Sequence, residues 1–75
     1  MEFHDKIKKI RKQLGLTQQQ VSASIGITYQ KYQKLEHGKS KPSFDTLIKL
    51  CRFFNVSSNY LLGLDEFIVD KSPKI

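Results

Sequence analysis

The sequence predicts an all-α protein with five short helices packed around one core. Apolar residues recur at the three- and four-residue spacing of a buried helix face, and residues that cap helices precede most of these stretches. Single glycines follow several stretches, where a left-handed residue can end a helix. No segment shows the alternation of apolar and polar residues that indicates a strand. The 75 residues suffice for one domain, whose folding buries only about 60% of the surface that the unfolded chain exposes.

The first helix is expected from Phe3 to Leu14, with Gly15 as its left-handed end. Its apolar face is made of residues four, three and four positions apart, and lysines fill the opposite face. The residues of this apolar face are Phe3, Ile7, Ile10 and Leu14. We expect them to form one side of the core.

Two shorter helices follow, joined by the turn Gly26-Ile27-Thr28. The first is expected from Gln18 to Ile25, because Thr17 is a good N-cap and Gln20 completes a capping box. Thr28 can cap the second helix, which should run to about His37. The inward positions expected in these helices are Val21, Ile25, Tyr32 and Leu35.

Two more helices are expected after the loop that contains Pro42. Ser43 caps a fourth helix, which Asn55 ends, and Ser57 caps a short fifth helix from Asn59 to Leu62. The inward stripe of the fourth helix is expected to be Phe44, Leu47, Ile48, Cys51 and Phe54. Residues 1–64 should therefore form the domain, and residues 65–75 a C-terminal tail or the start of a linker.

Composition excludes several classes of protein. The single cysteine, Cys51, rules out an internal disulfide and suits a reducing cytoplasm. No apolar run reaches the roughly 18 residues of a membrane span, and the N-terminal MEFHDKIKKI does not have the pattern of a signal peptide. His4 and His37 are far apart in the sequence, and neither belongs to a cluster of carboxylate or cysteine side chains with metal-ligand spacing, so we expect neither a metal nor another cofactor. No catalytic set of residues supports an enzyme.

The positive charge lies in the first part of the chain. Residues 1–41 contain nine basic and three acidic side chains, whereas residues 42–75 contain four of each, so the net charge of +6 belongs to the first part. Such a surface attracts a polyanion, although lysines at this density can also serve only to solvate a surface. The basic residues concerned are Lys6, Lys8, Lys9, Arg11, Lys12, Lys31, Lys34, Lys39 and Lys41.

The second and third helices have the pattern of a DNA-binding helix-turn-helix. The third helix carries polar, amide-rich residues at its start, and basic residues follow it, as a helix in the DNA major groove requires. Glutamine can pair with adenine, lysine with guanine, and a tyrosine ring can contact a thymine methyl group. The expected base-reading residues are Thr28, Tyr29, Gln30, Gln33 and Lys34.

Phosphate contacts should position the domain on the duplex. The start of the second helix offers free backbone donors and the positive end of a helix dipole. The side chains expected to bind phosphate are Gln18, Lys31, Lys39 and Lys41, although the two loop lysines could also be merely solubilising. Glu36 would repel phosphate, so a structural ion pair with Arg11 explains it better.

The order of four short motifs resembles the phage-repressor and Cro type of helix-turn-helix protein, the Xre family. The motifs are LTQ at 16–18, GIT at 26–28, LEHGKSKPS at 35–43 and NVSSNYLLG at 55–63. The resemblance covers residues 7–64 and implies a lambda-repressor-like domain with its third helix in the major groove. It also implies a homodimer on an inverted-repeat operator. The implied protein is a transcriptional regulator, a repressor, acting in the bacterial cytoplasm at the nucleoid.

The resemblance also implies roles for individual residues. Gln18 matches a phosphate-binding glutamine, and Arg11 with Glu36 matches the structural ion pair. The principal base-reading positions are matched by Tyr29, Gln30 and Lys34, and the phosphate-binding loop by Lys39 and Lys41. The residues that match a dimer contact are Val56, Ser57, Ser58 and Tyr60. The departures are Ser22 and Cys51 in place of alanine, Tyr32 in place of a smaller apolar residue, and an unusually bulky Tyr29.

A second hypothesis is that the domain acts through a protein partner, as an antitoxin does. The tail would then dock through its apolar residues Leu64, Phe67, Ile68 and Val69. This role is compatible with DNA binding. The sequence also leaves open whether a further oligomerisation or sensor domain belongs to the protein.

Overall fold

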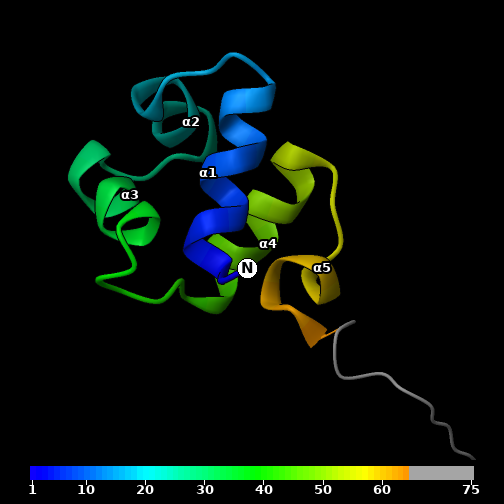
Figure 1. Ribbon diagram of the computed structural model, residues 1–75. Coiled ribbons are helices and arrows are strands. Elements are labelled where there is room, and N and C mark those ends of the chain that lie inside the picture. Colours follow the sequence, from blue (N-terminus) through cyan, green and yellow to red (C-terminus); the bar gives the residue numbers. More distant parts are fainter. Residues whose placement is uncertain (65–75) are drawn as a thin grey trace, which may run out of the picture.

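The computed structural model describes residues 1–64, and within them it contains five α-helices and no strand (Figure 1). The helices are α1 (Phe3–Gln13), α2 (Gln18–Ile25), α3 (Tyr29–Glu36), α4 (Phe44–Phe54) and α5 (Ser58–Leu62). The all-α fold class is confirmed, and every helix begins and ends within one residue of its predicted position. The proposed tail, residues 65–75, lies outside the described residues, and so do Phe67, Ile68 and Val69.

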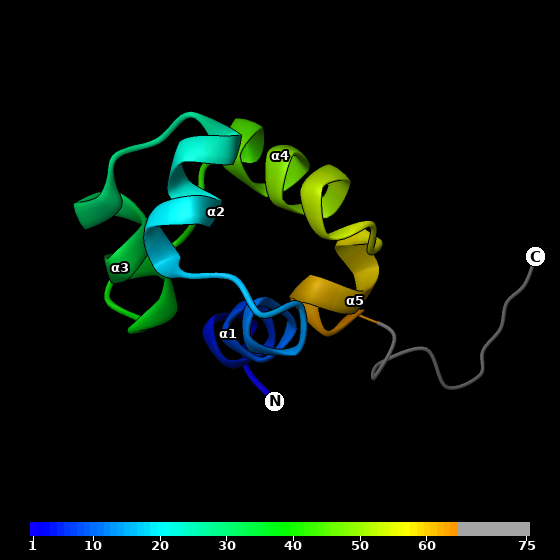
Figure 2. The same cartoon turned by 90° about the horizontal axis from the view of Figure 1, so that it is seen from above.

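The helices surround a common core. Figure 2 shows α1 nearly end on, with α4 across the core from it, α2 and α3 on one side and α5 on the other. Side chains with at most 2% exposure come from every helix and fill the space between them. These side chains are Ile7, Val21, Tyr32, Leu35, Leu50 and Leu61. The arrangement leaves one long face of α3 at the edge of the molecule (Figure 1).

Hydroxyl side chains fix the starts of four helices. Thr17, Thr28, Ser43 and Ser57 each accept a hydrogen bond from the backbone N–H three residues later, over 3.0–3.2 Å. At the start of α2 the cap is reciprocal, because the Gln20 side chain accepts from the Thr17 backbone at 2.8 Å. Each such cap stabilises its helix by about 1 kcal/mol. The caps explain why the helix bounds were readable from the sequence.

Two apolar positions were predicted wrongly. Leu14 is 54% exposed, because α1 ends at Gln13 and Leu14 is its C-cap rather than a residue of its buried face. Phe44, the first residue of α4, is 75% exposed. The buried stripe of α4 is Thr46, Leu50 and Phe54 instead. The apolar pattern missed this stripe because Thr46 is a polar residue. The Thr46 hydroxyl can be buried because it accepts a hydrogen bond from Ser43 Oγ over 3.0 Å.

Lys6 is also not part of a solvated lysine face. Only 5% of the residue is exposed, and its Nζ donates to the backbone carbonyl of Tyr60 over 2.7 Å. The same Nζ lies 4.9 Å from the centre of the Tyr60 ring. This contact joins the first turns of α1 to α5, so Lys6 is a structural residue that connects the two ends of the domain.

Candidate nucleic-acid interface

The turn between α2 and α3 is short and unstrained. Gly26 ends α2 with a φ of +75°, and the Ile27 N–H donates to the Ser22 carbonyl over 3.0 Å. A glycine adopts this left-handed conformation without the cost that a side chain would add. Ser22 is only 3% exposed and returns its hydroxyl to the Gln19 carbonyl at 3.0 Å, so its polar group is satisfied. The turn therefore holds α3 against α2 at a fixed angle.

The outer face of α3 carries most of the side chains predicted to read bases. Tyr29, Gln30 and Lys34 are exposed there, together with Lys31, and Gln33 is half-buried. Thr28 lies at the helix start, where its Oγ1 accepts from the Lys31 N–H at 3.1 Å. Thr28 can therefore serve as a cap while its own hydroxyl hydrogen remains available.

A buried ion pair holds α3 to α1. Arg11 Nε donates to Glu36 Oε2 over 2.6 Å, and a second guanidinium nitrogen donates to Oε1 over 3.0 Å. The Glu36 side chain is fully buried and that of Arg11 is 11% exposed. Arg11 also donates to the Leu16 carbonyl at 2.9 Å, which fixes the chain just before α2. One arginine thus ties α1 to the start of α2 and to the end of α3.

Tyr32 completes the support beneath α3. Its hydroxyl is buried and donates to Glu36 Oε2 over 2.6 Å. Burial raises the pKa of the Glu36 carboxyl, but hydrogen bonds from Arg11, Tyr32 and Gln18 outweigh burial and lower this pKa below its ordinary value. The hydrogen bond with Glu36 raises the pKa of Arg11. Burial raises the pKa of Tyr32, and the hydrogen bond with Glu36 raises it further. The site therefore holds an ionised pair and a neutral phenol.

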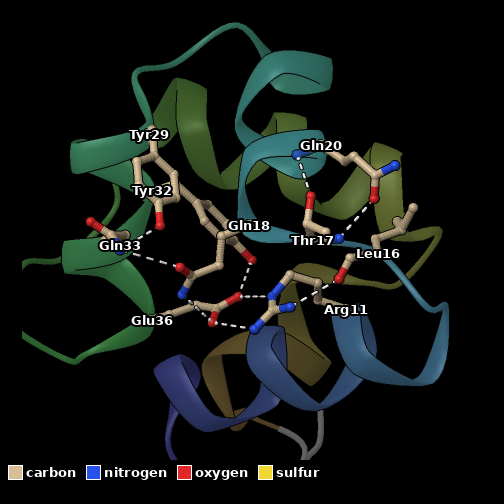
Figure 3. Close-up of polar contacts among 9 residues, drawn as sticks. All are labelled: Arg11, Leu16, Thr17, Gln18, Gln20, Tyr29, Tyr32, Gln33 and Glu36. Carbon is tan, nitrogen blue, oxygen red and sulfur yellow. Dashed lines mark hydrogen bonds and ion pairs between the residues drawn. The ribbon is translucent and has the colours of Figure 1, made fainter.

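Two glutamines extend this network to the surface (Figure 3). Gln18 Nε2 donates to Glu36 Oε1 over 3.0 Å, and Gln33 Nε2 donates to Gln18 Oε1 over 3.4 Å. Gln33 Nε2 also donates to Tyr29 Oη over 2.8 Å. The structure thus brings together two predicted base readers and one predicted phosphate ligand. The sequence offered no signal for this, because the contacts join residues from two helices.

The hydrogen-bond donors predicted to bind phosphate lie at the start of α2 and in the loop after α3. In residues 1–64, the backbone N–H groups of Gln18 and Gln19 have no acceptor, and they point out of the positive end of α2. The Gln18 side chain predicted to bind phosphate already donates one hydrogen to Glu36. Lys39 and Lys41 are exposed in the loop after α3.

The predicted dimer residues lie around α5, next to an apolar groove. Ser57, Ser58 and Tyr60 are exposed, and Val56 is half-buried. The neighbouring groove has a volume of about 500 Å³ and lies between α4 and α5. It is lined by Phe44, Leu47, Ile48, Cys51, Arg52, Ser58 and Leu62.

Other kinds of site find no support in the part of the chain that the structure describes. Residues 1–64 contain no group of three or more His, Cys, Asp or Glu side chains that could hold a metal ion. No helix among them is long and apolar enough to cross a bilayer. The single thiol, Cys51, is half-buried, and burial raises its pKa.

Comparison with known proteins identifies the family. A family model described as helix-turn-helix matches residues 7–61. The chain belongs to this helix-turn-helix family. It is 39% identical to YonR of Bacillus subtilis, an uncharacterized, SPβ prophage-derived HTH-type transcriptional regulator, over 80 aligned positions that cover 97% of this chain and 74% of YonR. It is 35% identical to the transcriptional regulator ImmR of the same organism, over 88% of this chain and 52% of ImmR. It is 31% identical to the phage CTXφ repressor RstR of Vibrio cholerae, over 96% of this chain and 65% of RstR.

Solved structures share the fold at low sequence identity. The P22 c2 repressor, in a complex with a synthetic operator, matches with a TM-score of 0.79 and 22% identity, over 83% of this chain and 94% of that one. SinR, in a complex with SinI, matches with a TM-score of 0.78 and 23% identity, over 92% and 68% of the two chains. The family match and the phage-derived relatives confirm the resemblance to phage repressors that was inferred from the motifs, and the solved structures share the fold. The chain spans about half the length of ImmR and three quarters of that of YonR.

Proposed function

We propose that the protein is a sequence-specific regulator of transcription, a repressor, which reads double-stranded DNA with α3 in the major groove. The observation that carries this proposal is the outer face of α3. Exposed Tyr29, Gln30 and Lys34 stand on a helix that a buried ion pair, Arg11 with Glu36, holds rigidly to the rest of the domain. A fixed helix with amide and ammonium groups at its surface suits direct readout of base edges. The named roles of the relatives as transcriptional regulators support this function.

Phosphate contacts on both sides of α3 would set the register on the duplex. The free N–H groups at the start of α2 suit one phosphate, and Lys39 with Lys41 suits phosphates across the groove. Each phosphate neutralised adds about −0.9 to the slope of log affinity against log salt concentration. The preferred DNA sequence should therefore depend on α3. The salt dependence of binding should depend on the start of α2 and on Lys39 and Lys41.

We further propose that two copies bind an inverted repeat through α5 and the groove beside it. Ser58 belongs both to the predicted dimer residues and to the groove lining, so the two features form one continuous surface. Phe44 and Leu62, at 75% and 44% exposure, would be covered by a second copy. Dimers of this kind read half-sites whose centres lie about one helical turn apart.

Selection from a random duplex library at about physiological salt tests the proposal. We expect enrichment of an inverted repeat with half-sites near one helical turn apart. Gln30→Ala should weaken binding by about 1–3 kcal/mol and relax one base pair of each half-site. Lys39→Ala should weaken binding to all sequences alike and reduce the salt slope by about 1.

Lys49→Ala is the matched control for Lys39→Ala. Lys49 is an exposed lysine of α4 that lines a surface hollow with Arg52, Phe53 and the end of α2, and it is not among the residues predicted to contact DNA. Its removal changes the net charge equally and should leave the salt slope nearly unchanged. Failure to enrich any motif, or equal effects of the two lysine variants, would contradict the proposed interface.

Binding of a protein partner is a second candidate function. SinR, a structural neighbour, forms a complex with the protein SinI. Leu62 and Leu64 are each 44% exposed at the end of the described chain, which would suit a docking surface. Removing residues 64–75 should then abolish co-purification of a stoichiometric partner while leaving DNA selection intact. If the truncated protein still co-purified with the partner, this role would be contradicted.

A further inference from the structure

The Glu36 carboxylate can only accept hydrogen bonds, and this fixes the direction of every bond around it. Arg11, Tyr32 and Gln18 all donate to its two oxygens over 2.6–3.0 Å. Glu36 is 3% exposed, so the carboxylate is shielded from bulk solvent. An ionised carboxylate without donors would be costly at such a depth. Each neighbour must therefore turn a hydrogen toward it.

Gln18 has one orientation that satisfies this requirement. Its NH2 group faces Glu36 Oε1 at 3.0 Å, because a carbonyl oxygen there would meet a carboxylate oxygen. The carbonyl of Gln18 must then face the opposite way, toward α3. It accepts from Gln33 Nε2 at 3.4 Å. Glu36 thus determines, through Gln18, that an acceptor faces Gln33.

The Gln18 carbonyl in turn fixes the orientation of the Gln33 amide. Its Nε2 donates to Gln18 Oε1 and to Tyr29 Oη, the latter over 2.8 Å, so both amide hydrogens have partners. A flipped amide would set two carbonyl oxygens against each other. The Gln33 carbonyl therefore points away from Gln18 (Figure 3), and it has no donor within residues 1–64. Tyr29 uses an oxygen lone pair in this contact and keeps its O–H hydrogen.

We infer that Gln33 reads an amino group in the major groove, with Tyr29 as a donor beside it, and that Glu36 and Gln18 are the positioning residues that impose this polarity. This inference rests on the proposed function. A carbonyl acceptor matches adenine N6–H or cytosine N4–H, and a phenolic donor matches a purine N7 or a carbonyl oxygen. If both groups meet one base, that base is adenine, which presents N6–H2 beside N7.

Base analogues that lack the amino group test the inference. The operator obtained by selection is rebuilt with purine in place of each adenine, and with 2-pyrimidinone in place of each cytosine, one position at a time. At one position of each half-site the wild-type protein should bind the analogue roughly 3- to 10-fold more weakly, as loss of one hydrogen bond predicts. Gln33→Ala should bind both duplexes at that position equally.

The variant Gln18→Met tests whether Gln18 orients the Gln33 amide or only stabilises the domain. Without the Gln18 carbonyl, the Gln33 amide can turn and offer either edge, so the ratio of affinities for the two duplexes should fall to within about twofold. A purely structural role would weaken both duplexes together and leave the ratio unchanged. Gln30→Ala is the control, because Gln30 is exposed on the same helix and its loss should preserve the ratio at this position. Circular dichroism confirms that each variant is folded.

The outcomes distinguish this inference from the proposed function. An enriched operator with no analogue-sensitive position that depends on Gln33 overturns the inference alone. A ratio that persists in Gln18→Met overturns the positioning role of Glu36 and Gln18. A library that yields no operator overturns the proposed function and the inference with it.

Discussion

Replacing Tyr32 with phenylalanine removes one buried hydroxyl and changes little else. Tyr32 has no exposed surface, and its hydroxyl lies 2.6 Å from the buried Glu36 carboxylate. A hydrogen bond to a charged group contributes about 1.5–3 kcal/mol to stability, and Arg11 remains to hold the carboxylate. In a domain of this size, 1 kcal/mol shifts Tm by about 4–8 °C, so Tyr32→Phe should lower Tm by about 6–24 °C.

Thermal and urea unfolding followed by circular dichroism measure this loss. Tyr29→Phe is the matched control, because its hydroxyl belongs to a side chain at the surface, 36% exposed, and its removal should cost less than about 0.5 kcal/mol. Equal stability of Tyr32→Phe and the wild type would refute the reasoning, since it would mean that the buried hydrogen bond contributes nothing. A larger effect of Tyr29→Phe would refute it as well.

Three further predictions concern Glu36, Lys6 and Cys51. The pKa of Glu36 is lowered by folding, so the stability it contributes is present above the unfolded-state pKa of about 4.3 and is lost as pH falls through the lower folded-state pKa. Urea unfolding between about pH 2 and 6 should therefore show a steeper acid loss in the wild type than in Glu36→Gln. Lys6→Met keeps the buried stem but loses the bond to the Tyr60 carbonyl, and it should lower the free energy of unfolding by about 1–3 kcal/mol, whereas Lys8→Met, at an exposed position, should lower it little. Burial raises the pKa of Cys51, so its alkylation near neutral pH should be several-fold slower than in the urea-unfolded protein. If two copies cover the groove, the reaction should slow further as protein concentration rises, and a rate independent of concentration would count against that interface.

Local chemistry made the helices predictable from the sequence. Thr17, Thr28, Ser43 and Ser57 occupy cap positions whose hydrogen bonds span only three residues, so their effect is contained in a short segment. The apolar spacing likewise indicated which face of most helices is buried. It failed for α4, where Thr46 supplies one turn of the buried face and Phe44 lies outside it.

Contacts between distant segments could not be read in the same way. Lys6 looked like any other lysine of a charged helix, because its partner is a backbone carbonyl 54 residues away. The ion pair of Arg11 with Glu36 was predicted from charge and from the family resemblance. Neither argument predicts that Gln18 and Gln33 extend this pair to the surface. The orientation of the Gln33 amide depends on three residues from two helices, so no pattern along one helix encodes it.

The network under α3 divides the recognition surface into positions that differ in how freely they can change during evolution. Gln30 and Lys34 are exposed and have no polar partner in residues 1–64, so under the proposed function a new side chain there should alter the preferred DNA sequence without disturbing the fold. Gln33 is bonded to neighbours that reach the buried Glu36, so a change there requires compensation nearby. New operators should therefore be acquired first through Gln30 and Lys34, while the base pair that we infer Gln33 to read should be retained among close descendants.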